Sequence, residues 1–311
     1  MTKLVNINSD KKILLTGSNG LLGNKLVGQL LEIDARFLAT SNGENTNPNC
    51  PDKNYLELDI TDKQSVLEVL NNYQPDVIIN TAAMTNVDAC ESLPDECFKV
   101  NVDGFKNLFD WSASNDAHVI QISTDFIFDG ENGPYKEEDL PNPLSEYGRS
   151  KLESEKVCFN SSYKNWTILR TIVVYGTAPN LKRSNIVLWA RETLKNEKSI
   201  NIVDDQFRAP TWADDLAMAC LLSIEKKVKG VFHISGPETM SIFDIVNKIA
   251  DFYNIDKRLI KPIKTDELGQ VASRPPKTGF KLDKARKELG YSPKTFEETL
   301  RLLENELESN N

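Results

Sequence analysis

The feature that most constrains the fold is a glycine-rich turn, Gly17-Ser18-Asn19-Gly20-Leu21-Leu22-Gly23, which joins a short apolar run to an amphipathic helical pattern. Gly17 permits the tight turn, Gly20 lets the backbone approach a pyrophosphate, and Gly23 lets the helix pack closely on a sheet. The free N–H groups at the start of the helix favour a phosphate. Three glycines alone also make ordinary turns, so it is the order strand, turn, helix that predicts a dinucleotide-binding unit.

The rest of the chain repeats this alternation of apolar runs and amphipathic helical patterns. Strands are expected at 12–15, 36–40, 55–58, 77–80, 118–123, 167–174 and 230–234. The pattern predicts an α/β fold, a Rossmann-type doubly wound parallel sheet with helices on both faces. Polar helices and proline-rich joints in the second half predict a smaller, discontinuous C-terminal substrate lobe. We expect the nucleotide-binding domain at 1–176 plus about 210–235, and the lobe at about 177–209 plus 236–311.

Charge and composition exclude several classes of function. The formal net charge is −9 and no long basic run is present, so nucleic acids and anionic membranes are not expected as partners. The N-terminal residues lack the basic and apolar segments of a signal peptide, and no apolar stretch is long enough to span a bilayer. We therefore expect a cytoplasmic protein.

The five cysteines and two histidines argue against a disulfide framework and against a metal site. The cysteines are scattered without Cys-x-x-Cys pairs, which favours reduced thiols in partly buried positions. His118 and His233 each lie in an apolar strand-like run, where packing is the expected role. No metal is predicted, and a Ser-His-Asp triad is disfavoured.

Three further runs are candidates for the cofactor site beside the glycine turn. Thr40-Ser41-Asn42 ends the second strand, where an NAD-specific site usually carries Asp or Glu, so NADP is favoured over NAD. The other interpretation of this run is a plain turn into a loop. Asp59-Ile60 can flank the adenine, and Ala82-Ala83 supplies small side chains where the dinucleotide crosses the fourth strand.

A proton-donor set follows the fifth strand. Tyr147 and Lys151 are four residues apart and share one helical face. We expect the Lys151 ammonium to lower the pKa of the Tyr147 phenol and make it a usable acid. Thr124, at the strand end, would hold a substrate oxygen beside Tyr147. A Tyr-x-x-x-Lys pair alone is usually a solvated helix face, and it gains meaning here from the glycine turn and the Ser-Thr strand end.

These motifs together resemble the extended short-chain dehydrogenases/reductases over nearly the whole chain. A longer set is similar to the dTDP-4-dehydrorhamnose reductase family, and it comprises Ala82-Ala83-x-Thr85-x-Val87-Asp88-x-x-Glu91, Ser123-Thr124-Asp125-Phe126-x-Phe128-x-Gly130, Asp205-Gln206-x-x-Ala209-Pro210-Thr211 and Ala272-Ser273-Arg274-Pro275. The resemblance implies reduction of the 4-keto group of a nucleotide-linked deoxysugar by NADPH or NADH, with Thr124, Tyr147 and Lys151 as the catalytic set.

The resemblance also implies roles outside that set. Val87 and Asp88 would lie near the sugar, and Arg274 near the nucleotide diphosphate, where the other interpretation is a surface arginine beside a proline turn. Asn101 matches a structural asparagine of the superfamily, or is simply an amide on a helix expected around 96–112. A homodimer is the family expectation.

Two positions depart from the family pattern on the expected substrate side. Val173 stands where the family carries Trp, and Arg208 stands where it carries Gly, which puts the particular sugar in doubt. Two other functions stay open. One is another nucleotide-sugar epimerase, dehydratase or reductase of the superfamily. The other is a non-catalytic regulatory subunit, because the beta subunit of methionine adenosyltransferase resembles the same reductases.

Overall fold

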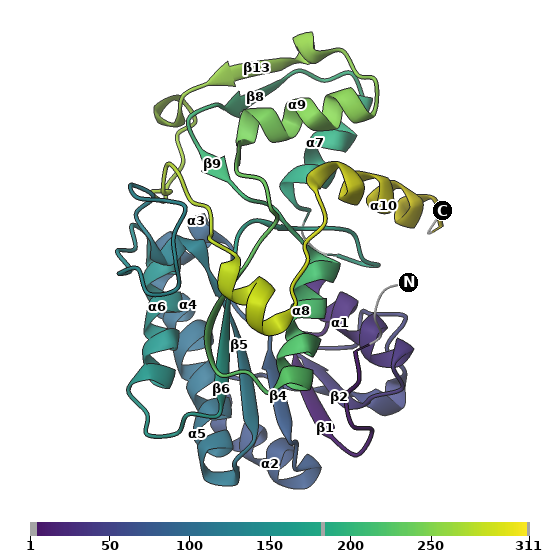
Figure 1. Ribbon diagram of the computed structural model, residues 1–311, viewed down its shortest axis with the longest axis vertical. Coiled ribbons are helices and arrows are strands. Elements are labelled where there is room, and N and C mark those ends of the chain that lie inside the picture. The colour runs from purple at the N-terminus through teal and green to yellow at the C-terminus, as the bar shows by residue number, and fades with distance from the viewer. Residues whose placement is uncertain (1–4, 182–183, 310–311) are drawn as a thin grey trace.

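A seven-stranded parallel sheet forms the centre of the computed structural model, which describes residues 5–181 and 184–309 (Figure 1). Residues 1–4, 182–183 and 310–311 fall within the predicted lobes but lie outside the described part. The strand order is β11-β6-β5-β4-β1-β2-β3. The strands are β1 (Lys12–Thr16), β2 (Arg36–Ser41), β3 (Tyr55–Glu57), β4 (Val77–Asn80), β5 (His118–Thr124), β6 (Trp166–Thr171) and β11 (Gly230–Ile234). The order reverses between β1 and β4, the switch point where such sheets bind nucleotides, and the predicted Rossmann-type fold is confirmed.

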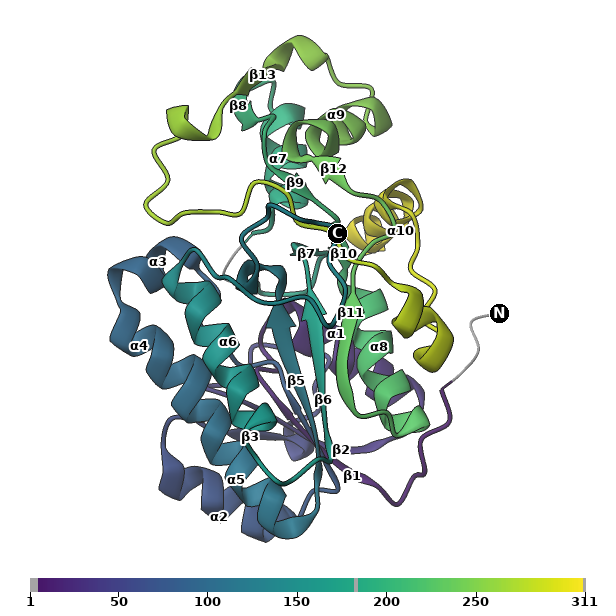
Figure 2. The same ribbon diagram turned by 60° about the vertical axis from the view of Figure 1, so that its left-hand side comes forward.

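Helices cover both faces of this sheet (Figure 2). The helices α1 (Leu21–Glu32) and α8 (Ala213–Lys226) pack together on one face, and α2 (Lys63–Tyr73), α5 (Phe105–Asn115) and α6 (Glu146–Phe159) cover the other. Strand β4 is buried at every position: Ile79 joins the core under α1 and α8, whereas Ile78 joins the core under α2 and α5. Burial on both faces explains why such strands read as unbroken apolar runs.

The remaining helices and strands build a second body, here called the small lobe. It consists of α7 (Ile186–Lys195), β8 (Ile200–Val203), β9 (Phe207–Arg208), β12 (Met240–Ser241), α9 (Ile242–Phe252), β13 (Ile260–Ile263) and α10 (Phe296–Ser309). Strands β8 and β13 pair in parallel, and β9 pairs with β12 in antiparallel fashion. The lobe has its own core, which includes Val187, Ile202, Ile249 and Leu300. The exact lobe bounds stay a prediction.

Short elements lie between the larger helices and strands of both bodies. They are η1 (Asp52–Asn54), α3 (Val87–Ser92), α4 (Pro94–Phe98), η2 (Lys99–Gly104), η3 (Asp125–Ile127), β7 (Val174–Tyr175), β10 (Thr211–Trp212), η4 (Lys257–Leu259), η5 (Thr265–Glu267) and η6 (Ala285–Leu289). The helix expected around 96–112 is in fact divided, because η2 is a π-helical turn between α4 and α5. Such turns often occur at functional sites.

The histidines pack in the interior as predicted, and the cysteines are more deeply buried than predicted. His233 stacks on Phe280 with ring centroids 3.9 Å apart, and His118 is buried with its Nε2 2.9 Å from Thr167 Oγ1. All five cysteines are buried. Within the described ranges, no group of three or more acidic, histidine or cysteine side chains is arranged to hold a metal ion, and no helix is long and apolar enough to cross a membrane.

Candidate active site

The glycine turn forms a narrow backbone cradle at the switch point of the sheet. Gly17 has φ +71°, and a Cβ atom there would lie 2.7 Å from the backbone nitrogen of Ala82. A Cβ at Gly23 would overlap the Gly17 carbonyl. Gly20 is the N-cap of α1, and among the described residues no side chain bonds to its free N–H groups as a cap. These properties fit a pyrophosphate at the helix N-terminus.

The end of β2 is more buried than its sequence indicates. The Thr40 hydroxyl donates to the Leu15 carbonyl at 3.3 Å, and the Ser18 hydroxyl donates to the Thr40 carbonyl at 3.1 Å. Both side chains are fully buried, so they stabilise the strand ends rather than face a ligand. Ser41 is half-buried and Asn42 is exposed, which leaves these two to meet a 2′-phosphate.

The residues predicted to flank the adenine lie just after the end of the next strand, β3. Asp59 is half-buried and accepts a hydrogen bond from the Thr61 backbone at 2.8 Å. Ile60 is buried beside Gly104, where a Cβ atom would lie 2.8 Å from the Ile60 side chain. Ala82, half-buried, lies directly against the glycine turn. The structure thus brings the glycine turn and the fourth strand end together.

The catalytic candidates meet where β5 ends and α6 begins. Ser145 caps α6, and its hydroxyl accepts from the Gly148 backbone at 3.2 Å. This cap starts the helix just before Tyr147, whose phenol lies near the Thr124 hydroxyl. The ring of Phe126 packs edge-on against Tyr147, with centroids 5.8 Å apart. Lys151 lies one turn further on and is buried.

The predicted effect of Lys151 on Tyr147 is wrong for the protein alone. Burial raises the pKa of Tyr147 well above its ordinary value, and the Asp125 carboxylate adds to the rise, while the Thr124 hydrogen bond opposes it. Burial also lowers the pKa of Lys151 to about 8, although the Glu155 carboxylate counteracts this. In both groups the loss of hydration penalises the charged form. Tyr147 is therefore held as a neutral phenol with its proton in place.

Glu155 is a supporting residue that the sequence analysis missed. It follows Lys151 by one helical turn and is fully buried. The Ser123 hydroxyl donates to Glu155 Oε1 at 2.6 Å, and Arg170 forms a bidentate pair with both Glu155 oxygens at 2.7 and 3.0 Å. The spacing of four residues from Lys151 is the only signal in the sequence. Glu155 fastens the catalytic helix to β5 and β6.

Asn101 joins the loop after β4 to the catalytic helix. Its side-chain oxygen accepts from the Met84 backbone at 2.8 Å, and its amide donates to the Met84 carbonyl at 3.0 Å and to Ser150 Oγ at 2.9 Å. The Ser150 hydroxyl donates in turn to the Tyr147 carbonyl at 2.8 Å. Of the two interpretations of Asn101, these contacts favour that of a structural asparagine, because its side chain bonds to the backbone of Met84 and to Ser150.

The predicted substrate residues come together from distant parts of the chain. Arg274 donates to Asp88 Oδ2 at 2.7 Å, and Asp88 Oδ1 accepts from the Ala272 backbone at 3.1 Å. Val87 begins the short helix α3 that carries Asp88. The Arg274 side chain is only 15% exposed and pairs with Asp88, so it is a largely buried cation rather than a free surface arginine.

Of the two departures from the family pattern, Arg208 lies next to the residue that follows Thr124, and Val173 packs against the core of the sheet body. Arg208 is buried, with its side chain next to the Asp125 carboxylate. Val173 has φ +39°, a strained value for a β-branched residue, and it separates β6 from β7.

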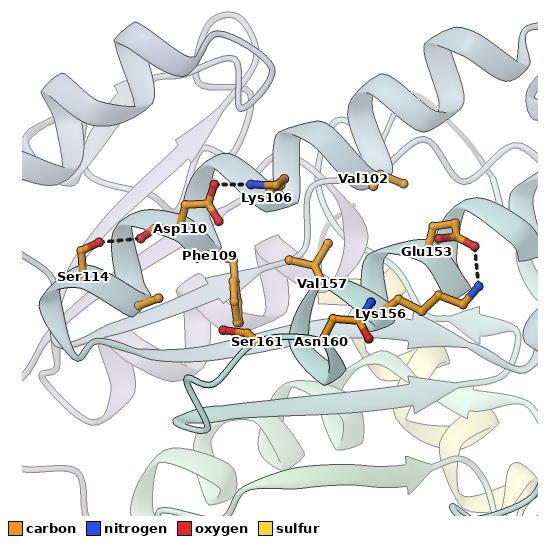
Figure 3. A pocket seen from close by; sticks show the side chains of 11 residues that line it. Val102, Lys106, Phe109, Asp110, Ser114, Glu153, Lys156, Val157, Asn160 and Ser161 are labelled. Carbon is orange, nitrogen blue, oxygen red and sulfur yellow. Dashed lines mark hydrogen bonds and ion pairs between the residues drawn. The ribbon is translucent and has the colours of Figure 1, made fainter.

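A separate groove of about 610 Å³ lies between α5 and α6, away from these residues (Figure 3). Its walls include Val102, Phe109 and Val157, and its charged side chains pair with each other, Lys106 with Asp110 and Lys156 with Glu153. Since these charges neutralise one another, the groove lacks the features of an anionic cofactor site.

The chain is similar in sequence and fold to several known proteins. The family model described as the RmlD substrate binding domain matches residues 11–309. The crystal structure of a dTDP-4-dehydrorhamnose reductase from Clostridium acetobutylicum is 32% identical, with a TM-score of 0.84 and coverage of 96% of this chain and 99% of that chain. A dTDP-4-dehydrorhamnose reductase from Bacillus anthracis, solved in complex with NADP, is 27% identical, with a TM-score of 0.82 and coverage of 95% and 99%. Methionine adenosyltransferase 2 subunit beta from Bos taurus is 33% identical over 92% of this chain and 84% of its own length.

Proposed function

This chain belongs to the RmlD substrate binding domain family, and on that basis we propose that it reduces the 4-keto group of dTDP-4-dehydro-rhamnose to give dTDP-rhamnose, with NADPH as the favoured cofactor. The observation that carries the proposal is that Tyr147, at the start of α6, lies near the Thr124 hydroxyl at the end of β5, with Lys151 buried one turn along the same helix.

The residues of this chain fit the cofactor that the family implies. The backbone of Gly17 and Gly20 and the first turn of α1 would hold the pyrophosphate, and Ser41 and Asn42 would face the adenosine ribose. When bound, NADPH supplies the hydride that reduces the keto carbon. The Lys151 side chain would face the nicotinamide half from one turn below Tyr147.

The protein's own part in the reaction is to hold the keto oxygen and to supply a proton. Thr124 places its hydroxyl at the end of β5, where it would donate a hydrogen bond to the keto oxygen. Tyr147 would give its phenolic proton to that oxygen as the alkoxide forms. Because burial raises the pKa of Tyr147, the phenol is fully protonated at neutral pH before each turnover. Asp88 and Arg274 would meet the sugar and the diphosphate.

The direct test measures loss of reduced cofactor. Purified protein is mixed with dTDP-4-dehydro-rhamnose and NADPH or NADH in parallel, together with a panel of other nucleotide 4-keto sugars. We expect turnover with NADPH and its loss in Tyr147→Phe. A Tyr147→Phe protein that kept full activity would remove the acid assignment. Turnover only with another sugar would point to the sister enzymes, and NAD that stays bound through purification would indicate an epimerase.

A second function is favoured by one specific finding, the 33% identity to a methionine adenosyltransferase subunit. In this alternative the chain binds a catalytic partner and does not reduce a sugar. Co-elution with a methionine adenosyltransferase catalytic subunit on gel filtration, without turnover of any keto sugar, would support it. The complete Thr124, Tyr147 and Lys151 set favours the reductase.

Location and assembly are part of the same proposal. We place the reductase in the cytoplasm, with a nucleotide sugar as its partner and with no nucleic acid or membrane partner. A homodimer is expected for the family, and light scattering of the purified protein measures it directly.

A further inference from the structure

Arg208 connects the small lobe to the catalytic residues. It lies on β9, which pairs with β12 of the small lobe, and its side chain is 3% exposed. Its Nε lies 3.8 Å from Oδ2 of Asp125, the residue directly after the catalytic threonine. Its Nη1 donates to the carbonyls of Phe207 and Pro276 at 2.7 and 3.4 Å. Its side chain is thus held between the small lobe and the segment that follows β5.

Asp125 carries the contact onward to Thr124. The Thr124 hydroxyl donates to Asp125 Oδ1 at 3.2 Å, while the hydroxyl of Thr278 donates to Oδ2. The Asp125 carboxylate therefore contacts Thr124 of the sheet, Thr278 of the C-terminal segment and Arg208 of the small lobe. Asp125 is 1% exposed, so its charge depends on these partners and on Arg208.

A second contact runs from Arg208 to the other catalytic hydroxyl. The guanidinium lies over the Phe126 ring at 5.8 Å from its centroid. The same ring packs edge-on against Tyr147 at 5.8 Å. Phe126 therefore lies between the Arg208 guanidinium and the Tyr147 phenol. A change in the position of Arg208 reaches Tyr147 through the packing of this ring. The single side chain of Arg208 thus supports Thr124 through Asp125 and Tyr147 through Phe126.

We propose that Arg208 and Asp125 form an ion-pair clasp between the small lobe and the sheet that positions the Thr124 and Tyr147 hydroxyls for catalysis. In this proposal Arg208, which the sequence places on the substrate side, acts as a positioning residue. The proposal rests on the proposed reductase function for its kinetic readout only.

The pair can affect catalysis because the Thr124 hydroxyl has a single hydrogen to donate. A charged Asp125 accepts that hydrogen, and the opposite charge of Arg208 weakens the carboxylate as an acceptor, so the hydrogen can turn to the substrate oxygen. Without Arg208, the buried carboxyl is driven toward its protonated form. A protonated carboxyl no longer accepts from Thr124 as it does in the structure, so the orientation of the Thr124 hydroxyl is no longer held.

The test compares Arg208→Gln, Arg208→Lys and the double variant Asp125→Asn/Arg208→Gln. We expect Arg208→Gln to lower kcat about 10²-fold, the loss typical of a misplaced catalytic group, with the KM for NADPH changed by less than about twofold. Arg208→Lys keeps the charge but not the planar fork, and should recover about tenfold of that loss. The double variant leaves no uncompensated buried charge, so it should fold with a wild-type melting temperature and still have low kcat.

Glu306→Gln is the matched control. Glu306 of α10 pairs with Lys25 of α1 at 2.7 Å. The substitution therefore removes another ion pair between the small lobe and a helix of the sheet body, and this pair does not contact Thr124 or Tyr147. Its kcat should stay within about twofold of the wild type. A double variant with wild-type kcat would show that the pair only stabilises the fold, and would overturn the proposal.

A spectroscopic readout makes the test independent of turnover. Tyrosine labelled with ¹³C at Cζ reports the phenol's hydrogen bonding, and the Tyr147 signal is assigned by its loss in Tyr147→Phe. Arg208→Gln should shift this signal, and Glu306→Gln should not. An unmoved Tyr147 signal in Arg208→Gln contradicts the clasp even when the wild type is inactive on every keto sugar, a result that would refute the proposed function alone.

Discussion

Replacing Lys151 by methionine should make the protein more stable at neutral pH while it abolishes turnover. Lys151 is 3% exposed, and burial lowers its pKa from 10.5 to about 8. At pH 7 the folded protein must therefore hold an ammonium in surroundings that favour the neutral amine. Methionine has a similar length and carries no charge, so it removes this cost. Active-site groups commonly reduce stability in this way.

The size of the effect follows from the two pKa values. One pKa unit corresponds to about 1.4 kcal/mol, so the difference between 10.5 and about 8 destabilises the folded state by about 3 kcal/mol at pH 7. Above pH 8 the folded protein releases the proton that the unfolded chain still holds. The penalty therefore falls as pH rises, to about 0.5 kcal/mol near pH 10.5.

Urea unfolding of both proteins at pH 7, 9 and 10.5 measures this difference in the free energy of unfolding. The control is Lys156→Met on the same helix, whose side chain is 46% exposed and whose replacement should change stability by less than about 0.5 kcal/mol. The reasoning is refuted if Lys151→Met is no more stable than the wild type at pH 7, or if its advantage does not shrink by pH 10.5.

Three further predictions concern the cradle, the loop anchor and acid stability. Gly17→Ala should destabilise the fold by about 1–3 kcal/mol and abolish NADPH binding measured by fluorescence, because φ is +71° and the new Cβ would meet Ala82; retention of full binding would contradict the cradle. Asn101→Ala should lower the free energy of unfolding by about 1–3 kcal/mol and lower kcat about tenfold, because Met84 and Ser150 lose their shared partner; unchanged initial rates and melts would show that the loop needs no anchor. Burial lowers the pKa of His118 from 6.5 to about 4, so between these values the unfolded chain binds a proton that the folded protein does not. At pH 5 the free energy of unfolding of the wild type should therefore be lowered by about 2 kcal/mol relative to pH 8, whereas that of His118→Gln should not show this loss. Equal losses in the two proteins, measured by urea titration, would contradict this prediction.

Local patterns in the chain were sufficient to predict the strand, glycine turn and helix that carry the candidate cofactor residues. Gly17, Gly20 and Gly23 follow a strand and open a helix, and backbone geometry allows few arrangements of such a segment. Tyr147 and Lys151 share a helical face because the α-helix repeats about every 3.6 residues. Each inference depends on residues within one or two turns of each other, where the covalent chain itself limits the geometry.

Contacts between distant segments were decided by the packing of the two bodies. Arg274 and Asp88 are 186 residues apart, and Thr278 and Asp125 are 153 residues apart, yet each pair is hydrogen-bonded. No periodicity connects positions so far apart, so the clasp of Arg208 and Asp125 was not visible in the sequence.

The same limit applies to charge. The four-residue spacing of Tyr147 and Lys151 determined that they share a helical face, but the pKa of Tyr147 moves upward rather than downward because burial outweighs its neighbours. The sequence by itself determined which groups stand at the end of each strand and on each helix face. Only the tertiary structure decided how much water each group keeps and which distant charge it meets, because both depend on surfaces brought together by folding.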